Sequence, residues 1–226
     1  MRCIVFDLDS TLCAIGKEIL PETVEMLKAL EDKGNRICIC SGKPTYYLVG
    51  MIRQVGLKNP VFIGENGGVI QFGVDLPPRE YHITTKLKSV VSRLKELRSQ
   101  MEERFGDNIW YQPNEIELTA FPKDERLFDE IEQFILSKAV EDIIVYRQID
   151  CFDIIPKDVS KRGGLEHLGN LLGLENEDFI AVGDGVNDYP MFDFAGLSIG
   201  INLKDTSKAT INFDHINKAL KYLLTL

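Results

Sequence analysis

Short apolar runs alternate with longer amphipathic segments along the first part of the chain. The apolar runs are of the kind buried on both faces of a parallel sheet, and the segments between them repeat apolar positions at helical spacing. The predicted strands are residues 3–6, 36–40, 61–63 and 69–72, and the predicted helices are residues 21–32 and 46–55. This β-α-β-α-β order predicts a doubly wound α/β sheet.

The pattern changes after residue 78. Two segments with helical spacing are each followed by a pair of short strands. The predicted elements are helix 85–105, strands 109–112 and 116–121, helix 124–139, and strands 143–147 and 151–155. The order α-β-β-α-β-β suits a small α+β module with an antiparallel sheet.

Alternation of single strands with helices resumes after Pro156. The predicted elements are helices 160–172, 188–194 and 216–224 and strands 179–182 and 197–201. We therefore expect a Rossmann-like core with a doubly wound parallel sheet, formed by residues 1–77 and 157–226. Residues 78–156 would be an inserted α+β domain.

Composition narrows the class of protein. The 226 residues are 44% hydrophobic and 27% charged, values typical of globular proteins rather than collagen-like or disordered chains. A net charge of −9 argues against nucleic acid or an anionic membrane as a partner. No run approaches the ~18 apolar residues of a membrane span, and Asp7 comes too early for a secretory signal. We expect a cytoplasmic protein.

Two of the five cysteines, Cys38 and Cys40, lie in a predicted buried strand. A metal or redox site is one interpretation of the pair. We favour the interpretation that both cysteines are small buried hydrophobic residues in a reducing cytosol, because no further Cys or His has the spacing of a metal ligand.

Polar residues follow three of the predicted strands. The segments are Asp7–Thr11, Ser41–Lys43 and Gly183–Asp188. Because ligands bind at the carboxyl ends of parallel strands, these segments should converge on one edge of the sheet. Closely packed carboxylates repel one another, and a hard divalent cation such as Mg²⁺ relieves that repulsion.

These motifs resemble those of the haloacid dehalogenase superfamily of phosphohydrolases. The shared motifs, in the family's order, are Asp-x-Asp-x-Thr at 7–11, Ser41, Lys161 and Gly-Asp-Gly-x-Asn-Asp at 183–188. Glu65-Asn66-Gly67-Gly68 and the insertion resemble the Cof-type branch, and the layout is most similar to archaeal-type phosphoglycolate phosphatases. The resemblance implies a phosphoric monoester hydrolase that needs Mg²⁺ and acts on a small phosphorylated metabolite, such as phosphoglycolate or a sugar phosphate.

The resemblance also implies catalytic and metal-binding roles. Asp7 would attack phosphorus and form an aspartyl-phosphate, while Asp9 would serve as general acid and then general base. Mg²⁺ would be held by Asp7, the backbone carbonyl of Asp9 and Asp184, with Asp188 orienting a water ligand of the metal.

Other residues would bind the substrate. The resemblance implies that Ser41, Gly42 and Lys161 bind the phosphoryl group and that Asn187 supports the site. Ser41 alone could equally be a helix cap, and Lys157 competes with Lys161. We prefer Lys161 because it opens a predicted helix and matches the family motif.

Spacing locates the cap of such an enzyme. Thirty-four positions separate Asp7 from Ser41, and 120 positions separate Ser41 from Lys161, so only the second interval has room for a cap domain. We expect Arg147 and Asp150, at the turn between its last two strands, to contact substrate. A phosphomutase and a phospho-ligand sensor remain alternatives, and the chain could be a monomer or a homodimer.

Overall fold

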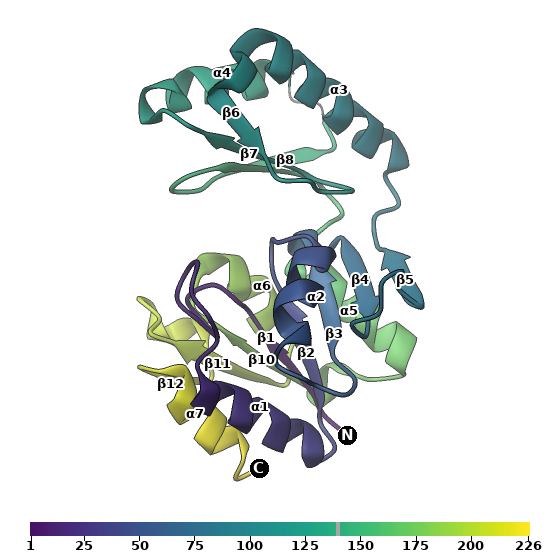
Figure 1. Cartoon of the computed structure of the whole chain (residues 1–226), viewed down its shortest axis with the longest axis vertical. Coiled ribbons are helices and arrows are strands. Elements are labelled where there is room, and N and C mark those ends of the chain that lie inside the picture. The colour runs from purple at the N-terminus through teal and green to yellow at the C-terminus, as the bar shows by residue number, and fades with distance from the viewer. Residues whose placement is uncertain (139–140) are drawn as a thin grey trace. The chain divides into compact units, whose positions relative to one another are not determined.

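The computed structural model describes residues 1–138 and 141–226 and divides into two compact units. The core unit comprises Met1–Thr84 and Ser160–Leu226, and the inserted unit comprises Thr85–Val159 (Figure 1). The sequence predicted junctions near residues 78 and 156. The structure places both a few residues later. The first is later because residues 80–83 form a strand that pairs within the core sheet.

The core unit contains one eight-stranded sheet in the order β12-β11-β10-β1-β2-β3-β4-β5. Its strands are β1 (Cys3–Phe6), β2 (Arg36–Cys40), β3 (Val61–Gly64), β4 (Val69–Phe72), β5 (Glu80–Ile83), β10 (Phe179–Gly183), β11 (Leu197–Ile201) and β12 (Ile211–Phe213). The strands from β12 to β3 are parallel, whereas β4 pairs antiparallel with both β3 and β5. This arrangement confirms the predicted α/β fold with a mainly parallel sheet.

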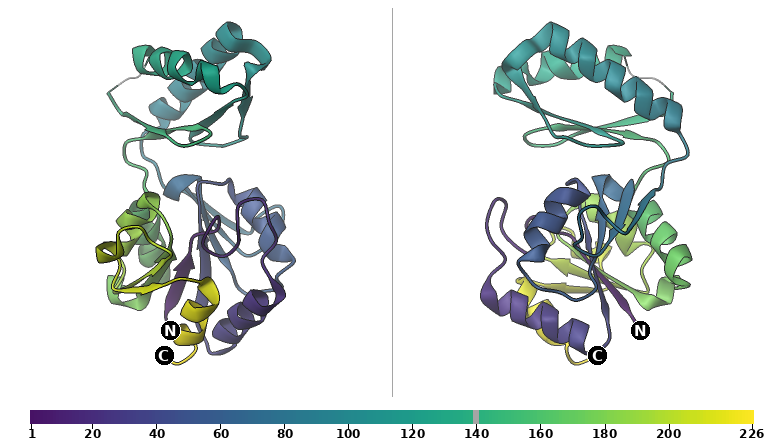
Figure 2. Two further views of the ribbon diagram at one scale, coloured as in Figure 1. Left: turned by 90° about the vertical axis from the view of Figure 1, so that its left-hand side faces the viewer. Right: turned by 45° about the vertical axis from the view of Figure 1, so that its right-hand side comes forward.

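Helices cover both faces of this sheet (Figure 2). They are α1 (Pro21–Asp32), α2 (Thr45–Arg53), α5 (Lys161–Leu172), α6 (Tyr189–Phe192) and α7 (Ile216–Leu223). Alternation along β1 sends Ile4 and Phe6 into a core shared with α1, α2 and α7, and sends Cys3 and Val5 into one shared with α5 and α6. Burial on both faces explains why the parallel strands are continuously apolar.

Cys38 and Cys40 are free and buried in the layer that packs against α5 and α6. Burial raises the pKa of Cys40 to about 12. A metal or redox site needs the thiolate, so this environment favours the interpretation of these residues as small hydrophobes.

The inserted unit follows the predicted order of elements. Its helices and strands are α3 (Lys88–Phe105), β6 (Ile109–Tyr111), β7 (Leu118–Pro122), α4 (Phe128–Lys138), β8 (Ile143–Arg147) and β9 (Phe152–Pro156). The antiparallel sheet has the order β6-β7-β9-β8, and α3 and α4 pack on one of its faces around Met101, Ile131 and Phe152. Ala139, the predicted end of the second helix, lies outside the described residues.

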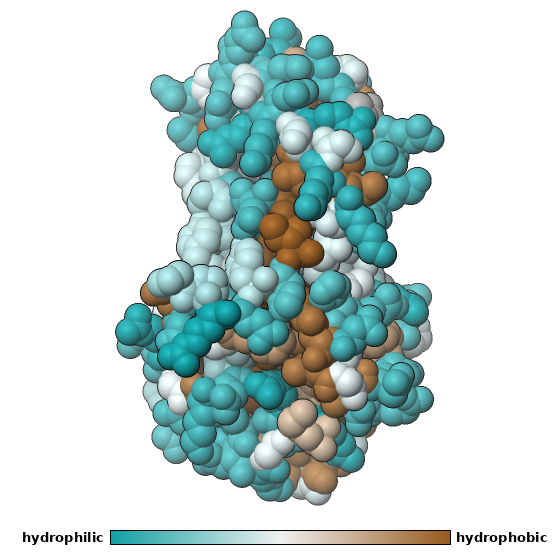
Figure 3. Space-filling model, turned by 90° about the vertical axis from the view of Figure 1, so that its right-hand side faces the viewer, coloured by the Kyte–Doolittle hydropathy of each residue, from teal (hydrophilic) through white to brown (hydrophobic). Residues whose placement is uncertain are grey.

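Two strands were not predicted, and both lie at edges of the core sheet. They are β5 and β12. On β5, Tyr81 and Ile83 are exposed. Figure 3 shows the side of the molecule on which β5 lies in Figure 1, and most side chains on that face are hydrophilic.

Short 3₁₀ turns connect several of these elements. They lie at Glu65–Gly67, Gly106–Asn108, Glu125–Leu127, Asn176–Asp178, Val186–Asp188 and Thr206–Lys208. Among the described residues, no helix has both the length and the apolar character needed to cross a bilayer.

Candidate active site

The site forms where the chain order of the sheet reverses. From β1 the chain adds β2 and β3 on one side, and after the insertion it adds β10, β11 and β12 on the other. Phe6 is in register with both Ile39 and Val182, and Asp7 continues this pairing by donating its N–H to the Val182 carbonyl at 2.9 Å. Residues that follow β1, β2 and β10 therefore meet at one edge, as the sequence predicted.

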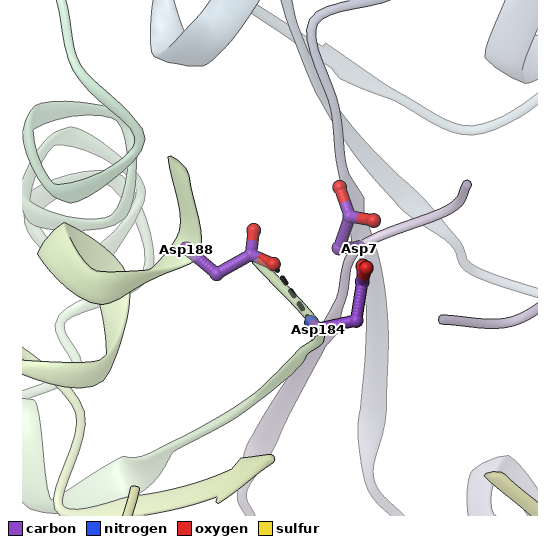
Figure 4. A group of neighbouring side chains, drawn as sticks. All are labelled: Asp7, Asp184 and Asp188. Atoms are coloured by element: carbon purple, nitrogen blue, oxygen red, sulfur yellow. Dashed lines mark hydrogen bonds between the residues drawn. The ribbon is translucent and has the colours of Figure 1, made fainter. Parts of the chain in front are cut away.

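Three carboxylates converge at this edge (Figure 4). Asp7 follows β1, Asp184 follows β10, and Asp188 ends the 3₁₀ turn Val186–Asp188. Each offers an oxygen within 4.8 Å of the others. Asp7 is 5% exposed and Asp188 is 0% exposed, whereas Asp184 is half-buried. Like charges so close and so buried require compensation.

Lys161 supplies part of that compensation. It is the first residue of α5 and is 2% exposed. Its Nζ donates to Asp7 Oδ1 at 2.7 Å and to Asp188 Oδ1 at 2.6 Å. The N-cap residue Ser160 accepts a hydrogen bond from the Gly163 N–H at 3.0 Å, which fixes the start of the helix. The structure thus brings Lys161 to the carboxylates, whereas Lys157 is exposed.

Further hydrogen bonds hold the other two carboxylates. Asp188 Oδ2 accepts from the N–H groups of Asp184 at 2.9 Å and Gly185 at 3.1 Å. Gly183 has to be a glycine, because a Cβ there would lie 2.4 Å from Asp188 Oδ2. The Thr11 hydroxyl donates to Asp184 Oδ1 at 2.9 Å. The cluster is therefore oriented before any ligand binds.

The electrostatics of the cluster favour a cation. Burial raises the pKa of Asp7 to about 7, opposed by Lys161 and reinforced by Asp188. Burial also raises the pKa of Asp184, against the hydrogen bond from Thr11. Burial would lower the pKa of Lys161, but Asp188 and Asp7 raise it well above its ordinary value. When ionised, three carboxylates and one ammonium leave two negative charges, so this set of oxygen ligands fits one hard divalent cation such as Mg²⁺.

Asp9 is not part of this three-carboxylate cluster. Its half-buried carboxylate lies 3.5 Å from the Nζ of Lys43, so the Asp7–Thr11 and Ser41–Lys43 segments meet through an ion pair. Ser10 between the two motif residues has a φ of +66°, which turns the chain sharply after Asp9. Asp9 thus takes part in an ion pair with the loop after β2 rather than in the carboxylate cluster.

Ser41 is buried and does not cap a helix. The N-cap of α2 is Pro44, and Ser41 Oγ instead accepts from the Lys43 N–H at 3.3 Å. Gly42 is half-buried, and a Cβ there would lie 3.2 Å from Asn66 Oδ1. This excludes the capping alternative and shows that the loop is closely backed by Asn66.

The Asn187 side chain takes no part in the hydrogen bonds that hold the three carboxylates. Its side chain is exposed, and a Cβ on Gly185 would lie 2.7 Å from its Oδ1. Among the described residues it makes no side-chain hydrogen bond to Asp7, Asp184 or Asp188. Its role in substrate binding stays a prediction.

Arg147, expected to contact substrate, has partners within the inserted unit. Its guanidinium donates to Asp129 and Glu132 of α4 and lies over the Phe128 ring. Arg147 shares its side of β8 with Ile143 and Val145, which pack against the core formed with α3 and α4, so it lies on the face of the sheet that these helices cover. A contact of Arg147 with substrate stays a prediction. Asp150, at the turn, is exposed.

Sequence reasoning missed two contacts within the site. It assigned no role to Thr11, which orients Asp184, and it did not foresee that Lys161 would bind two carboxylates at once. The Thr at the end of Asp-x-Asp-x-Thr was a signal for the first. The second had no local signal, because Asp7 and Asp188 are distant from Lys161 in sequence.

Replacing Lys161 tests this bridge. Lys161→Met should lower the melting temperature in metal-free buffer, because breaking a buried ion pair costs about 3–5 kcal/mol. Added Mg²⁺ should raise the melting temperature of this variant more than that of the wild type. The control is Lys157→Met, an exposed position where we expect a change within about 0.5 kcal/mol. Equal melting temperatures for Lys161→Met and wild type would contradict the bridge.

Comparison with known proteins identifies the family. A family model described as haloacid dehalogenase-like hydrolase matches residues 4–115 and 91–212. A phosphoglycolate phosphatase of Methanococcoides burtonii is 27% identical over 219 residues, covering 97% of this chain and 91% of that protein. A 5-amino-6-(5-phospho-D-ribitylamino)uracil phosphatase of Bacillus subtilis is 24% identical over 264 residues, covering 99% and 97%.

Solved structures share the fold over the whole length. A haloacid dehalogenase-like hydrolase from Bacteroides thetaiotaomicron superposes with a TM-score of 0.76 at 20% identity, covering 98% of this chain and 99% of that one. The matched residues of the family model span more than half of the chain and include the segments that carry Asp7, Lys161 and Asp184. The expectation drawn from the motifs is confirmed, and the chain belongs to the haloacid dehalogenase-like hydrolases.

Proposed function

We propose that this chain is a Mg²⁺-dependent phosphatase that hydrolyses a small phosphorylated metabolite through an aspartyl-phosphate on Asp7. The observation that carries the proposal is the bridge from Lys161 to Asp7 and Asp188 beside Asp184. The Lys161 ammonium holds the buried Asp7 carboxylate in a fixed orientation, as a nucleophile requires. The same positive charge would stabilise the negative oxygens of a phosphoryl group. Two relatives that align with this chain over nearly their whole length are named phosphatases, which supports the same activity.

Asp7 begins the reaction. Lys161 engages Oδ1, so Oδ2 is the oxygen that attacks phosphorus. The P–O bond to the leaving group breaks as the Oδ2–P bond forms, and Asp9 protonates the departing alkoxide. Asp9, now a carboxylate, then takes a proton from the water that attacks the aspartyl-phosphate, and orthophosphate leaves with Asp7 restored.

Asp7, Asp184 and the backbone carbonyl of Asp9 would hold Mg²⁺, with Asp188 beside them. When bound, the ion supplies positive charge that keeps Asp7 ionised and offsets charge on the phosphoryl oxygens. The raised pKa of Asp7 supports this need, since burial otherwise favours the protonated form, which is a poor nucleophile.

Ser41, Gly42 and Lys161 would bind the phosphoryl oxygens. The Ser41 hydroxyl and the Gly42 N–H lie in the loop after β2, next to β1 in the sheet. Lys43 would stabilise the Asp9 carboxylate through their ion pair once Asp9 has given up its proton. An acid placed two residues after a nucleophile favours a hydrolase over a sensor, because binding alone requires no proton transfer.

The inserted unit would act as a cap that selects the leaving group. The residues assigned to chemistry all lie in the core unit, and the insertion begins and ends between Ser41 and Lys161. We propose phosphoglycolate or a sugar phosphate as the substrate class, and the phosphoglycolate phosphatase among the relatives supports the first of these. A screen of phosphorylated metabolites would choose between them.

Asp7→Asn should abolish hydrolysis while leaving the fold intact, because the amide keeps the shape but cannot form the acyl-phosphate. We expect at least a ~10³-fold loss of kcat, measured as phosphate release from p-nitrophenyl phosphate with Mg²⁺. The control is Asp205→Asn, an exposed position whose carboxylate accepts hydrogen bonds from Ser207 and is not part of the three-carboxylate cluster. Retention of more than a few per cent of wild-type turnover by Asp7→Asn would sink the assignment.

Chelation should stop the reaction, and Mg²⁺ should restore it. Mg²⁺ should also raise the melting temperature, because an ion that binds only the folded protein stabilises it by about 2.7 kcal/mol at 100 times its dissociation constant. Asp184→Asn should weaken this thermal response, whereas Asp205→Asn should keep it. Full activity in excess EDTA, after metal analysis confirms removal, would rule out the metal requirement.

Replacing residues 85–159 by a short Gly/Ser linker should leave slow hydrolysis of p-nitrophenyl phosphate and remove preference among metabolites. The measurement is kcat/KM across a panel of phospho-metabolites for the full and shortened chains. Circular dichroism of the shortened chain serves as the folding control. An unchanged ranking of substrates would place specificity in the core unit instead.

A further inference from the structure

The 3₁₀ turn after β3 has an unusual backbone. Glu65, Asn66 and Gly67 all have positive φ, at +51°, +54° and +107°. Only Gly takes such values readily, so the two preceding residues must be held there by their surroundings. Glu65 is also 2% exposed. The turn is therefore a fixed element rather than a loose connection.

One side of this turn holds the proposed phosphate-binding loop. The Asn66 N–H donates to the Ser41 carbonyl at 3.2 Å, and the Glu65 N–H donates to the Lys43 carbonyl at 3.1 Å. These bonds fix both ends of the three-residue loop. Between them, the Asn66 amide packs against Gly42, where a Cβ would lie 3.2 Å from Oδ1.

The other side of the turn touches the start of α5. A Cβ on Gly67 would lie 2.0 Å from the Ser160 carbonyl oxygen and 3.1 Å from the Lys161 nitrogen. A Cβ on Gly164, one turn along the helix, would lie 2.9 Å from the Gly67 Cα. The backbones meet without side chains between them. One turn thus sets the position of both Ser41 and Lys161.

Thr84 secures this turn from a third direction. Its hydroxyl donates to the Gly67 carbonyl at 2.9 Å, and its N–H donates to the Gly68 carbonyl at 3.0 Å. Thr84 is the last residue of the core unit before the insertion, and Ser160 is the first after it. Both ends of the interrupted core chain therefore contact Gly67.

We propose that Thr84 is a positioning residue for phosphate binding. By donating its hydroxyl to Gly67, it holds the turn that sets the Ser41–Lys43 loop and the first residue of α5 at their mutual distance. The inference rests on the proposed function, since it takes Ser41 and Lys161 as the groups that bind phosphate.

The test measures orthophosphate binding by calorimetry in Mg²⁺, together with KM and kcat for p-nitrophenyl phosphate. Thr84→Val removes the hydroxyl at constant shape and should weaken orthophosphate binding and raise KM about fivefold, the effect of one hydrogen bond. Thr84→Ser should stay near wild type. Thr84→Ala provides a second variant without the hydroxyl should Thr84→Val fail to fold.

Thr85→Val is the matched control. Its hydroxyl donates to Asp158 Oδ1 at 2.8 Å rather than to Gly67, so orthophosphate affinity should be unchanged. Wild-type affinity in Thr84→Val, or an equal loss in Thr85→Val, would overturn the inference, as would a lower melting temperature with unchanged affinity.

Binding and turnover separate this inference from the proposed function. A wild-type protein that binds orthophosphate without hydrolysing p-nitrophenyl phosphate would contradict the phosphatase assignment, while the affinities of the Thr84 variants would still decide the positioning role. A wild-type protein that binds no orthophosphate would overturn both.

Discussion

Lys161 donates to two carboxylates from a position where its own side chain is 2% exposed. Removing such charges from water costs several kcal/mol for each ion, so the groups persist only if each finds a partner of opposite charge. The partners come from the end of β1 and from the turn after β10, which the chain brings together only by completing the central sheet. The position of the ammonium is therefore a consequence of the whole core fold.

Even with this bridge, the site has more negative than positive charge, because one ammonium faces three carboxylates. Burial raises the pKa of Asp7 to about 7 even with Lys161 beside it, so the folded protein stores an unfavourable arrangement of carboxylates. Backbone N–H groups hold Asp188, and Thr11 holds Asp184, which prevents the carboxylates from moving apart to relieve the repulsion. Carboxylates that cannot move apart lose their mutual repulsion when a cation binds between them, which is the behaviour that the proposed Mg²⁺ requirement predicts.

In the core sheet, sequence patterns predicted the strongly buried strands and missed the two weakly buried ones, β5 and β12. The central strands have continuous apolar runs, since helices cover both of their faces, and these strands were found. In the edge strand β5 only His82 is half-buried and the other three residues are exposed, and in β12 all three residues are half-buried. Neither strand therefore has a continuous apolar run. The first junction was consequently placed too early in the chain.

Site residues followed a similar division. Positions immediately after buried strands, such as Asp7 and Asp184, could be located because strand ends fix them. Pairings between distant segments could not be located: the ion pairs of Arg147 with α4 depend on which face of the strand Arg147 occupies. The ion pair of Asp9 with Lys43 depends on the pairing of β1 with β2, which brings the segments after these strands together. The local sequence pattern predicts where a residue lies along a strand or at its end, whereas the residue that it contacts depends on how the strands pair.

The insertion interrupts the core at a point that costs the core little. Thr84 and Ser160 both contact Gly67, so the chain leaves and re-enters the core unit at neighbouring places. In the inserted unit, Asp158 accepts from Thr85 and from the Lys86 N–H, which ties its two ends together as well. A domain whose ends are close can be accommodated without displacing sheet strands. The same geometry puts both junctions next to the turn that contacts the Ser41 loop and the start of α5. The chain therefore passes between the two units beside the residues proposed to hold phosphate.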